Sequence, residues 1–595
     1  MAGLSRRQFI AAIAGMAAVW AIPFEQLGNL TSSRAIGADA PSTLLQTIRF
    51  GSVTRGKYRK LVAAAGEAYE TRVDLLGRAA AATRVNTRRS LLYIGHLSDI
   101  HIMDAQSPAR LEPLLEQSQS LWGGAFRPQD VLTTQVAAEM VKSISQLRIS
   151  PVTGAPLAAA FVTGDSADML SNLETRWYVD LLDGKEIVPN SGATGKYEGV
   201  QGWDETYWAY HPENPNGDWF GDYGFPEIEG LLEAAVTGTV NSGGMPVPWY
   251  GVYGNHDSTF YGTFGVPAGL KELAIGDRKF YDWKALGLDY IGDWSTDTSA
   301  FGRSINTALR NNGMHLGSKA VTADPARKLL EQQDFMKAHF ETMPNPGPVG
   351  HGFTQENLDT GKTYWSADIN NCVRFFGLDT CNQVVGADGA LPENQFLWLK
   401  AGLEKAQSEG KLAVILSHHN SFTLENDAEL ATAPEKLIHA DELITMLQSF
   451  PNMVAWLNGH THNNTITAHK KSDGGGFWEI TTASCIDFPQ QQQMVEFVDN
   501  RDGTLSIFTT VVDHAAPVDP SGPLTQATLA SWSRQLAANN WIDGPTLRIG
   551  SELDRNTELL VPAPFDLSSI SDADIERNNI TNQARLMAWE AGWKL

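Results

Sequence analysis

Short apolar runs recur along the chain, and each ends in polar residues that can bind a metal. They cover residues 91–94, 158–163, 247–253, 412–416 and 454–457. Continuous apolar runs of this length predict strands that are buried on both faces. Between them, apolar residues recur at helical spacing in 136–147, 396–403 and 443–447. Alternating strands and helices predict an α/β fold whose site lies at the strand ends.

Two long segments separate the predicted strands, at about 172–245 and 259–390. We interpret them as insertions because they are rich in Gly, Asn, Asp and aromatic residues. The first contains a dense group of aromatic residues: Trp203, Tyr207, Trp208, Tyr210, Trp219, Phe220 and Tyr223. Such rings can form a platform for a substrate. We favour the alternative, in which they pack the insertion onto its own body.

The chain becomes richer in strand patterns after residue 478, with runs at 494–498 and 505–512. Residues 499–503 between them predict a hairpin turn, because the acidic spacing and the closing glutamate of a calcium loop are missing. From about 515 the chain is helical around 524–538 and 572–593 and shows no chemistry. We therefore expect a main domain over 91–515, an N-terminal extension over 41–90 and a C-terminal helical extension over 516–595.

The N-terminus has the pattern of a targeting segment. Arg6 and Arg7 precede an apolar run over 10–22, and Ala38-Asp39-Ala40 fits a cleavage site. The paired arginines predict a twin-arginine signal peptide over 1–40. An uncleaved membrane anchor is disfavoured, because the run is shorter than the ~20 residues that a span needs. We expect a secreted or cell-envelope protein with no transmembrane segment after cleavage, whose partner during export is the twin-arginine translocase.

The composition limits the partners. The formal net charge is −23, which argues against a large nucleic-acid or anionic-membrane surface. A phosphate substrate must then be attracted locally, by metal ions. Three cysteines are too few for a disulfide scaffold. A Cys372–Cys381 bridge is the one pairing we consider, and an intervening strand would hold the two apart.

Metal-binding side chains follow each predicted strand. Asp99 and His101 follow the first, and alternation along an extended segment places both on one side. Gly164 lets the chain turn sharply after the second strand, so that Asp165 is free to bridge two cations. The remaining three strands are followed by Asn255-His256-Asp257, by His418-His419, and by Gly459-His460-Thr461-His462.

Any one of these motifs could instead cap a loop or satisfy a hydrogen bond in the core. Coincidence does not explain five in series, each at the end of a predicted strand. Together they offer carboxylate, amide and imidazole donors. This set suits a pair of borderline divalent ions better than calcium or magnesium alone.

The ordered motifs resemble those of the calcineurin-like metallophosphoesterase superfamily. The resemblance rests on Asp99-x-His101, Gly164-Asp165, Gly254-Asn255-His256-Asp257, His418-His419 and Gly459-His460-x-His462. It implies a β-sandwich flanked by helices, with the two insertions outside the family pattern. It also implies that one metal is held by Asp99, His101 and His462, that the other is held by Asn255, His418 and His460, and that Asp165 bridges them. The leader, the insertions and residues 106–110 are similar to an actinobacterial subgroup exported by the twin-arginine route.

The sequence departs from related patterns at two places. Asn420 stands where the family commonly has a proline, which leaves His418 and His419 both available as the ligand; we choose His418 by position. Purple acid phosphatases have a tyrosine three residues after the bridging aspartate and no histidine in the first motif, whereas this chain has Asp168 and His101 there. No tyrosinate–iron site is therefore expected.

The resemblance implies a phosphoester hydrolase with two divalent metal ions, whether manganese, iron or zinc. Two such cations clamp a phosphoryl group and lower the pKa of a bound water, so that hydroxide can attack phosphorus. We expect His256 to give a proton to the leaving alkoxide, or else to bind a phosphate oxygen, and Asp257 to orient its imidazole or hold it protonated. The alternatives are a non-catalytic metal-binding or interaction module on the same fold and, among enzymes, a phosphodiesterase rather than a phosphomonoesterase.

Overall fold

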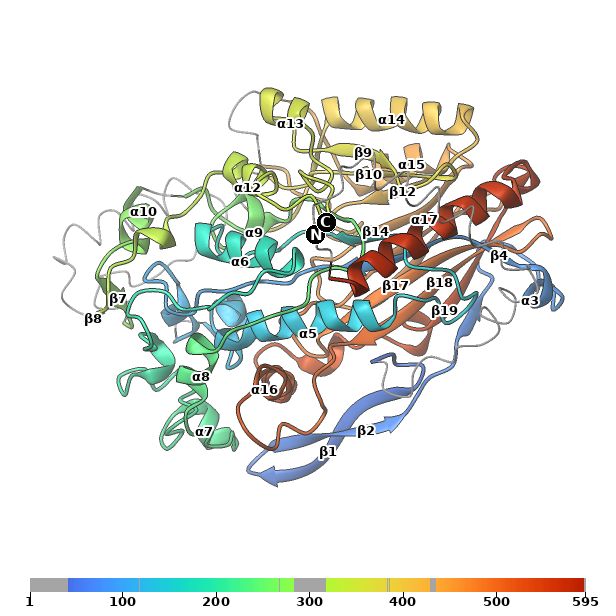
Figure 1. The fold of residues 1–595 in the computed structure, drawn as a ribbon. Helices are drawn as coiled ribbons and strands as arrows, with labels where there is room; N and C mark the ends of the chain where they lie inside the picture. The colour runs from blue at the N-terminus through green and yellow to red at the C-terminus, as the bar shows by residue number, and fades with distance from the viewer. Residues whose placement is uncertain are drawn as a thin grey trace, which may run out of the picture.

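Two β-sheets packed face to face form the centre of the molecule, and helices cover their outer faces (Figure 1). The computed structural model describes residues 41–592 apart from 117, 267, 283–316, 383, 385 and 429–434. The signal peptide expected over 1–40 lies outside the described residues. The described chain is a mixed α/β structure, as the pattern of strands and helices predicts.

The first sheet is built from seven strands of the described residues. Their order is β3 (Glu70–Arg72), β19 (Thr557–Pro562), β18 (Thr504–Asp513), β17 (Gln491–Asp499), β4 (Arg89–Leu97), β5 (Ala159–Val162) and β6 (Trp249–Gly251). Strands β4, β5 and β6 are parallel, so their carboxyl ends lie at the same edge. The expected hairpin at 499–503 is confirmed, because β17 and β18 pair antiparallel on either side of it.

The second sheet contains six strands in the part of the chain that the structure describes. Their order is β15 (Thr465–Lys470), β16 (Gly476–Thr481), β14 (Met453–Asn458), β12 (Leu412–Leu416), β10 (Val373–Gly377) and β9 (Trp365–Asp368). Strands β10, β12, β14 and β16 are parallel to one another. All five apolar runs that predict strands are strands, namely β4, β5, β6, β12 and β14.

Aromatic rings join the two sheets. Phe161 of β5 and Phe375 of β10 are fully buried and stack with ring centroids 4.3 Å apart. Elsewhere between the sheets, the indole N–H of Trp478 in β16 donates to the carbonyl of Leu560 in β19, at 3.2 Å. Phe161, Phe375 and Trp478 belong to one hydrophobic cluster that fixes the sheets relative to each other.

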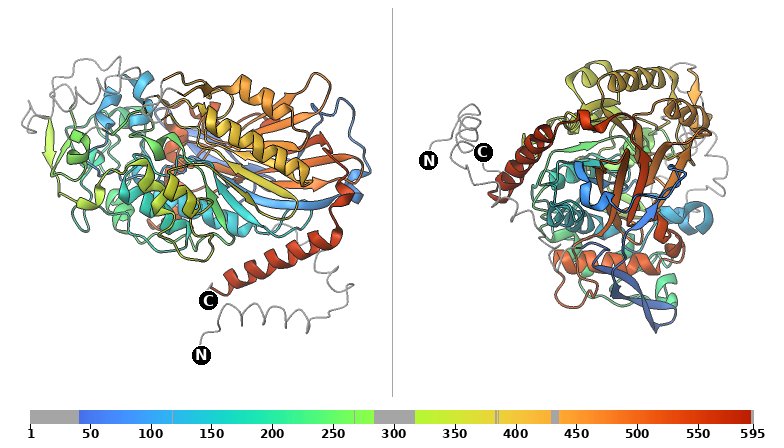
Figure 2. Two further views of the ribbon diagram at one scale, coloured as in Figure 1. Left: turned by 90° about the horizontal axis from the view of Figure 1, so that it is seen from above. Right: turned by 90° about the vertical axis from the view of Figure 1, so that its right-hand side faces the viewer.

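Long helices flank the sandwich (Figure 2). Helix α5 (Thr133–Gln146) contacts α6 (Asn172–Leu182), α16 (Gln526–Asn539) and β18 of the first sheet. Helices α14 (Glu393–Ser408) and α15 (Ala440–Gln448) place Leu399, Leu403, Leu443 and Leu447 in a cluster with residues of β12 and β14. Helix α17 (Asp572–Glu590) lies along one side. The apolar face of each of these helices thus packs against a sheet or a neighbouring helix.

Shorter elements complete the described chain. The helices are α3 (Arg84–Thr87), α4 (Gln119–Trp122), α7 (Trp219–Tyr223), α8 (Leu231–Thr237), α9 (Asn255–Ser258), α10 (Ala268–Ala274), α12 (Gln332–Ala338) and α13 (Gln355–Thr360). The strands outside the two main sheets are β1 (Gln46–Arg55) with β2 (Tyr58–Ala65), β7 (Arg278–Phe280) with β8 (Ser318–Ala320), and β11 (Leu391–Pro392) with β13 (Leu437–Ile438). The β1–β2 hairpin is fastened to α16, where Gln535 accepts a hydrogen bond from the Leu61 amide at 2.9 Å.

The aromatic residues of the first insertion pack together rather than forming an open platform. Trp208, Tyr210 and Phe220 are buried in a cluster that also contains Phe126 and Phe225. Nearby, the ring of Tyr223 stacks on Trp541 of the C-terminal segment with centroids 4.4 Å apart. This is the packing arrangement favoured from the sequence.

Three segments differ in detail from what the sequence predicts. Strands β9 and β10 belong to the second sheet, although they lie inside the range 259–390 interpreted as an insertion. Strand β19 belongs to the first sheet, although we expect 516–595 to be helical. Short strands with few flanking signals are defined by their partners in the sheet, which are distant in sequence.

Cys372 and Cys381, the one disulfide pairing considered from the sequence, are both buried and are not bonded to each other.

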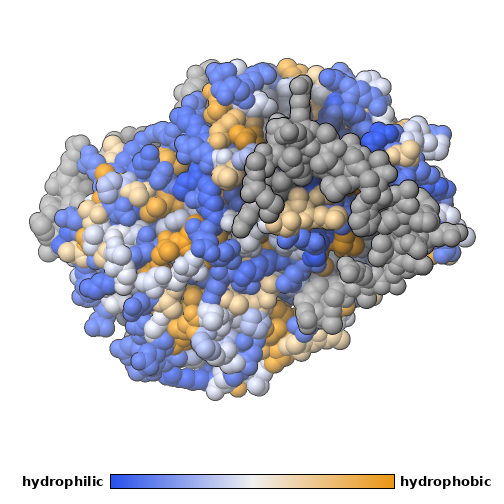
Figure 3. Space-filling view, in the orientation of Figure 1, coloured by the Kyte–Doolittle hydropathy of each residue, from blue (hydrophilic) through white to orange (hydrophobic). Residues whose placement is uncertain are grey.

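The surface seen in Figure 3 carries small groups of hydrophobic residues among hydrophilic ones. Among the described residues we find no helix that combines the length and the apolarity needed to cross a membrane. Large apolar side chains are instead concentrated in the core between the sheets and under the helices.

Replacing Phe161 with alanine tests the contact between the sheets. We expect the free energy of unfolding to fall by about 3–5 kcal/mol, because the change opens a cavity that the packed sheets cannot close. Chemical denaturation measures this loss. Phe422→Ala removes a phenyl ring that is 63% exposed and serves as the matched control. Equal losses in the two variants would show that the Phe161–Phe375 contact does not hold the sheets together.

Candidate metal centre

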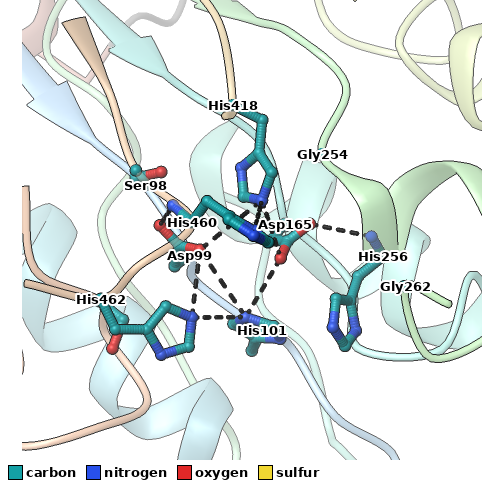
Figure 4. A network of polar contacts seen from close by, with 12 residues as sticks. Ser98, Asp99, His101, Asp165, Gly254, His256, Gly262, His418, His460 and His462 are labelled. Atoms are coloured by element: carbon teal, nitrogen blue, oxygen red, sulfur yellow. Dashed lines mark hydrogen bonds and ion pairs between the residues drawn. The ribbon is translucent and has the colours of Figure 1, made fainter. Parts of the chain in front are cut away.

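The pairing of strands brings the five motif loops to one edge of the sandwich. In the first sheet, Leu97 pairs with Val162, and Val162 pairs with Gly251. In the second sheet, Leu416 pairs with Leu457. A motif follows closely after each of these residues; four of them end their strands, and Leu457 is the last residue but one of β14. The register of the two sheets therefore sets how far each motif extends beyond its strand, and the motifs meet there (Figure 4).

Asp99, His101 and His462 converge from the two sheets. Nε2 of His462 lies 3.2 Å from Oδ1 of Asp99 and 3.3 Å from Nε2 of His101. Nε2 of His101 lies 4.0 Å from the same Asp99 oxygen. All three side chains are buried, and their donor atoms face one another (Figure 4). They form a first candidate cation site.

Asp165, His418 and His460 form a second group beside the first. Nε2 of His418 lies 3.1 Å from Oδ2 of Asp165 and 3.1 Å from Nδ1 of His460. Oδ2 of Asp165 also lies 3.6 Å from Nε2 of His101. Asp165 therefore faces both groups, which is the position that a bridging ligand requires (Figure 4).

Asn255 presents an oxygen that has no hydrogen-bond partner among the described residues. Its Nδ2 donates to the carbonyl of Gly262 at 3.0 Å, which fixes the orientation of the amide. Its Oδ1 is buried without a hydrogen bond in the described part of the chain. The N–H of the next residue, His256, donates to Oδ1 of Asp165 at 2.9 Å. The amide oxygen is thus held near Asp165 and available to a cation.

The geometry favours His418 over His419 as the ligand. His418 donates from Nδ1 to the carbonyl of Thr163 at 2.8 Å, which leaves Nε2 facing Asp165. Both ring nitrogens of His419 are engaged, with the Thr380 hydroxyl at 2.8 Å and the Ala387 carbonyl at 2.8 Å. His419 therefore supports the loop, and its nitrogens are not free to bind a metal.

The residues present fit a pair of metal ions. Buried polar atoms normally have hydrogen-bond partners, yet Oδ1 of Asp99 has none within the described chain, like Oδ1 of Asn255. Burial alone would raise the pKa of Asp165, but His418 and His256 hold it well below its usual range. Burial would also lower the pKa of His418, but the charge of Asp165 outweighs it and raises that pKa to about 9. The two buried carboxylates, Asp99 and Asp165, thus need positive charge beside them, which bound cations can supply.

Backbone strain is concentrated at the candidate ligands. Five of them have left-handed φ values, namely Asp99 (51°), His101 (48°), Asp165 (51°), His460 (68°) and His462 (57°). Each such non-glycine residue costs of order 1 kcal/mol or more and persists only where its surroundings hold it. Gly254 has no room for a side chain, because a Cβ there would lie 2.1 Å from Oδ1 of Asp165. The loops are therefore pressed together around the cluster.

His256 lies beside the cluster. Its ring centroid is 4.6 Å from that of His101, and its side chain is 18% exposed, whereas that of His101 is 2% exposed. Its Nδ1 lies 2.6 Å from the carbonyl of Asp168, so Nδ1 carries a proton and Nε2 is free. Burial lowers its pKa, which favours the neutral imidazole. A Cβ on Gly262 would lie 2.7 Å from Nε2, so the glycine leaves this nitrogen accessible.

The carboxylate of Asp257 does not bind the imidazole of His256, which the sequence predicts it to orient, but backbone amides. Its carboxylate accepts hydrogen bonds from the amides of Gly254 at 3.0 Å, Ser166 at 3.0 Å and Ala167 at 3.1 Å. Successive side chains on α9 point in different directions, so Asp257 and the imidazole of His256 diverge. Asp257 therefore fastens the third motif loop to the second instead of orienting His256. Burial raises its pKa to about 7.

A carboxylate backs each histidine of the first group. Oδ1 of Asp168 lies 3.0 Å from Nδ1 of His101, and its other oxygen accepts from Arg110 at 2.8 Å. Oδ2 of Asp487 lies 2.6 Å from Nδ1 of His462. Carboxylates in this position orient metal-binding imidazoles and make them better ligands. The sequence motifs indicate no such role for Asp168, and Asp487 belongs to no motif, so neither supporting contact is visible in the sequence.

No protein-family model matches the chain, and no curated protein matches it. Among solved structures, the chain is similar to a dimetal phosphatase from Danio rerio, at 10% identity and a TM-score of 0.29, covering 72% of this chain and 100% of the other. It is also similar to a protein described as a 5′-nucleotidase from Staphylococcus aureus, in complex with alpha-ketoglutarate, at 10% identity and a TM-score of 0.27, covering 74% of this chain and 58% of the other. Because both scores are low, we base the proposed function on the residues of the site.

Metal content tests the assignment of the two groups. We expect the wild type to retain two divalent ions per chain after dialysis, and Asp165→Asn to lose both, because Asp165 faces both groups. Asn255→Ala should lose one. Elemental analysis of the dialysed proteins gives the count, with the exposed Asp473→Asn as a control. Retention of both ions by Asp165→Asn would rule out the bridging role.

Proposed function

We propose that the chain is a dinuclear metal-dependent hydrolase of phosphoesters. The observation that carries this proposal is the convergence of metal-binding side chains from five strand ends on one buried point, with Asp165 facing both groups. The order of the motifs, which resembles that of calcineurin-like metallophosphoesterases, supports the phosphoester as the substrate class.

Two divalent cations bound here would act as Lewis acids, orient the phosphoryl group and lower the pKa of a bound water. The negative charge that would hold the two cations in place comes from Asp99 and Asp165, which are buried carboxylates. The net charge of −23 would otherwise repel a phosphate. Binding of an anionic substrate is therefore expected only where cations offset the acidic protein.

His256 is placed to handle the leaving group. Its proton on Nδ1 is committed to the Asp168 carbonyl, so Nε2 faces the substrate side as an acceptor. A phosphoester brings negative charge close to this nitrogen and favours its protonated form, which offsets the effect of burial. The imidazolium can then hold a phosphate oxygen and give its proton to the leaving alkoxide.

Two alternatives differ from this proposal. A binding module would need the metals but not His256, whereas this chain keeps a free imidazole nitrogen beside the cluster. Among enzymes, a phosphodiesterase and a phosphomonoesterase would use the same metal-binding residues. The two differ in the charge of the substrate, which is why both are included in the test.

Hydrolysis of p-nitrophenyl phosphate and bis-p-nitrophenyl phosphate tests the proposal. We expect turnover of at least one ester with manganese, abolished by chelation and restored by added metal. Absence of turnover with two metals bound would favour the binding module. His256→Ala should lower kcat for an alkyl phosphate by about 10²–10⁴-fold, the usual contribution of a general acid.

The loss in His256→Ala should be clearly smaller for p-nitrophenyl phosphate, because p-nitrophenolate leaves without a proton. His439→Ala, which removes a histidine outside the cluster, is the control and should match the wild type. Equal losses on both substrates would contradict the role of acid and leave the binding of a phosphate oxygen.

We also propose that residues 1–40 direct export through the twin-arginine translocase, a proposal supported by the sequence pattern alone. The protein recovered outside the cytoplasm should begin near Pro41. Mass spectrometry of its N-terminus makes the check, and an intact N-terminus on the exported protein would contradict the cleavage.

A further inference from the structure

A residue of the C-terminal segment, residues 516–595, contacts a carboxylate that supports the candidate metal centre. Arg548 lies between α16 and β19, in a segment that shows no chemistry in the sequence. Its Nη1 donates to Oδ2 of Asp487, and the same oxygen lies 2.6 Å from Nδ1 of His462. One carboxylate oxygen thus joins the C-terminal segment to a candidate metal ligand.

Asp487 is held firmly from the other side as well. Its Oδ1 accepts a hydrogen bond from Nε of Arg127 at 2.7 Å, and its amide donates to Oγ of Ser484 at 3.0 Å. Arg127 itself donates to the carbonyl of Gly124 at 2.9 Å. Asp487 is 2% exposed, so an anion there needs its paired cations to offset the cost of burial. Arg127 and Arg548, from segments more than 400 residues apart, supply them.

The contact decides how His462 faces the cluster. A carboxylate can only accept a hydrogen bond, so Nδ1 of His462 carries the proton. Its Nε2 is then left unprotonated and directed toward Oδ1 of Asp99, at 3.2 Å. Without Asp487, the ring could rotate or protonate Nε2, and either change removes a ligand from the first group.

The arrangement is not repeated in the second group. Nδ1 of His418 is bonded to a neutral carbonyl, that of Thr163, at 2.8 Å. A change at Asp487 or Arg548 should therefore affect one metal and spare the other. A general loosening of the fold would weaken both.

We propose that Asp487 is a positioning residue for His462, and that Arg548 makes retention of the metal in the first group depend on the C-terminal segment. This inference rests on the proposed metal centre, but not on hydrolysis. Arg548 is 19% exposed in its side chain, so it can be replaced without opening a large cavity.

Metal retention in the full chain, measured without substrate, tests the inference. The variants are Asp487→Asn, Arg548→Ala and Arg548→Lys, titrated with a competing chelator and followed by elemental analysis. We expect Asp487→Asn to lower the affinity for one of the two metal ions by about 10–100-fold, which is the usual effect of losing a carboxylate that is hydrogen-bonded to a ligand. Arg548→Ala should lower the affinity for the same ion by a smaller factor, and Arg548→Lys should recover part of that affinity.

Arg577→Ala is the matched control, because Arg577 also belongs to the C-terminal segment and pairs with Asp574 at 2.9 Å. The inference is overturned if Asp487→Asn and Arg548→Ala retain both ions as tightly as this control, or if they lose both ions in parallel. A wild type that retains two ions but hydrolyses no phosphoester would refute the proposed function and leave this inference standing.

Discussion

The site depends on one electrostatic constraint, which is that buried carboxylates and imidazoles share a small volume and need positive charge among them. Asp99 and Asp165 both lie within 4.0 Å of Nε2 of His418. Burial alone would raise the pKa of each carboxyl, yet the neighbouring imidazoles keep both low. Imidazoles in their charged form can supply part of the balancing charge. Divalent cations supply more of it in less space, which is the physical reason to regard the cluster as a metal centre.

The constraint is met because the loops are locked to one another as well as to the sheets. The amide of His460 donates to Oδ2 of Asp99 at 3.0 Å, across the two sheets. The amide of His256 donates to Asp165, and Asp257 receives the amides of the second loop. Left-handed backbone at the ligands can persist because these bonds and the packed sheets leave the loops no alternative. The hydrophobic contact between the sheets therefore contributes indirectly to the chemistry.

Segments outside the motifs support the cluster. Arg110 and Arg127 follow the first motif, and both are buried against carboxylates that back a histidine. The aromatic insertion joins the C-terminal segment through Tyr223 and Trp541. This contact anchors the C-terminal segment shortly before Arg548. The regions outside the motifs are thus part of the frame around the site.

The sequence by itself determined the strands that carry the motifs and the donor residues at their ends, because both depend on local patterns. An apolar run followed by a polar motif is readable within a few residues, as β12 and the two histidines after it illustrate. Tertiary structure alone decided the rest. Strands β10 and β19 are defined by partners distant in sequence. His418 is preferred as the ligand because Thr380 and Ala387 occupy both ring nitrogens of His419. The role of Asp487 depends on an arginine from another segment, Arg548. Such features arise from long-range packing and charge pairing, which leave no periodic trace in the chain.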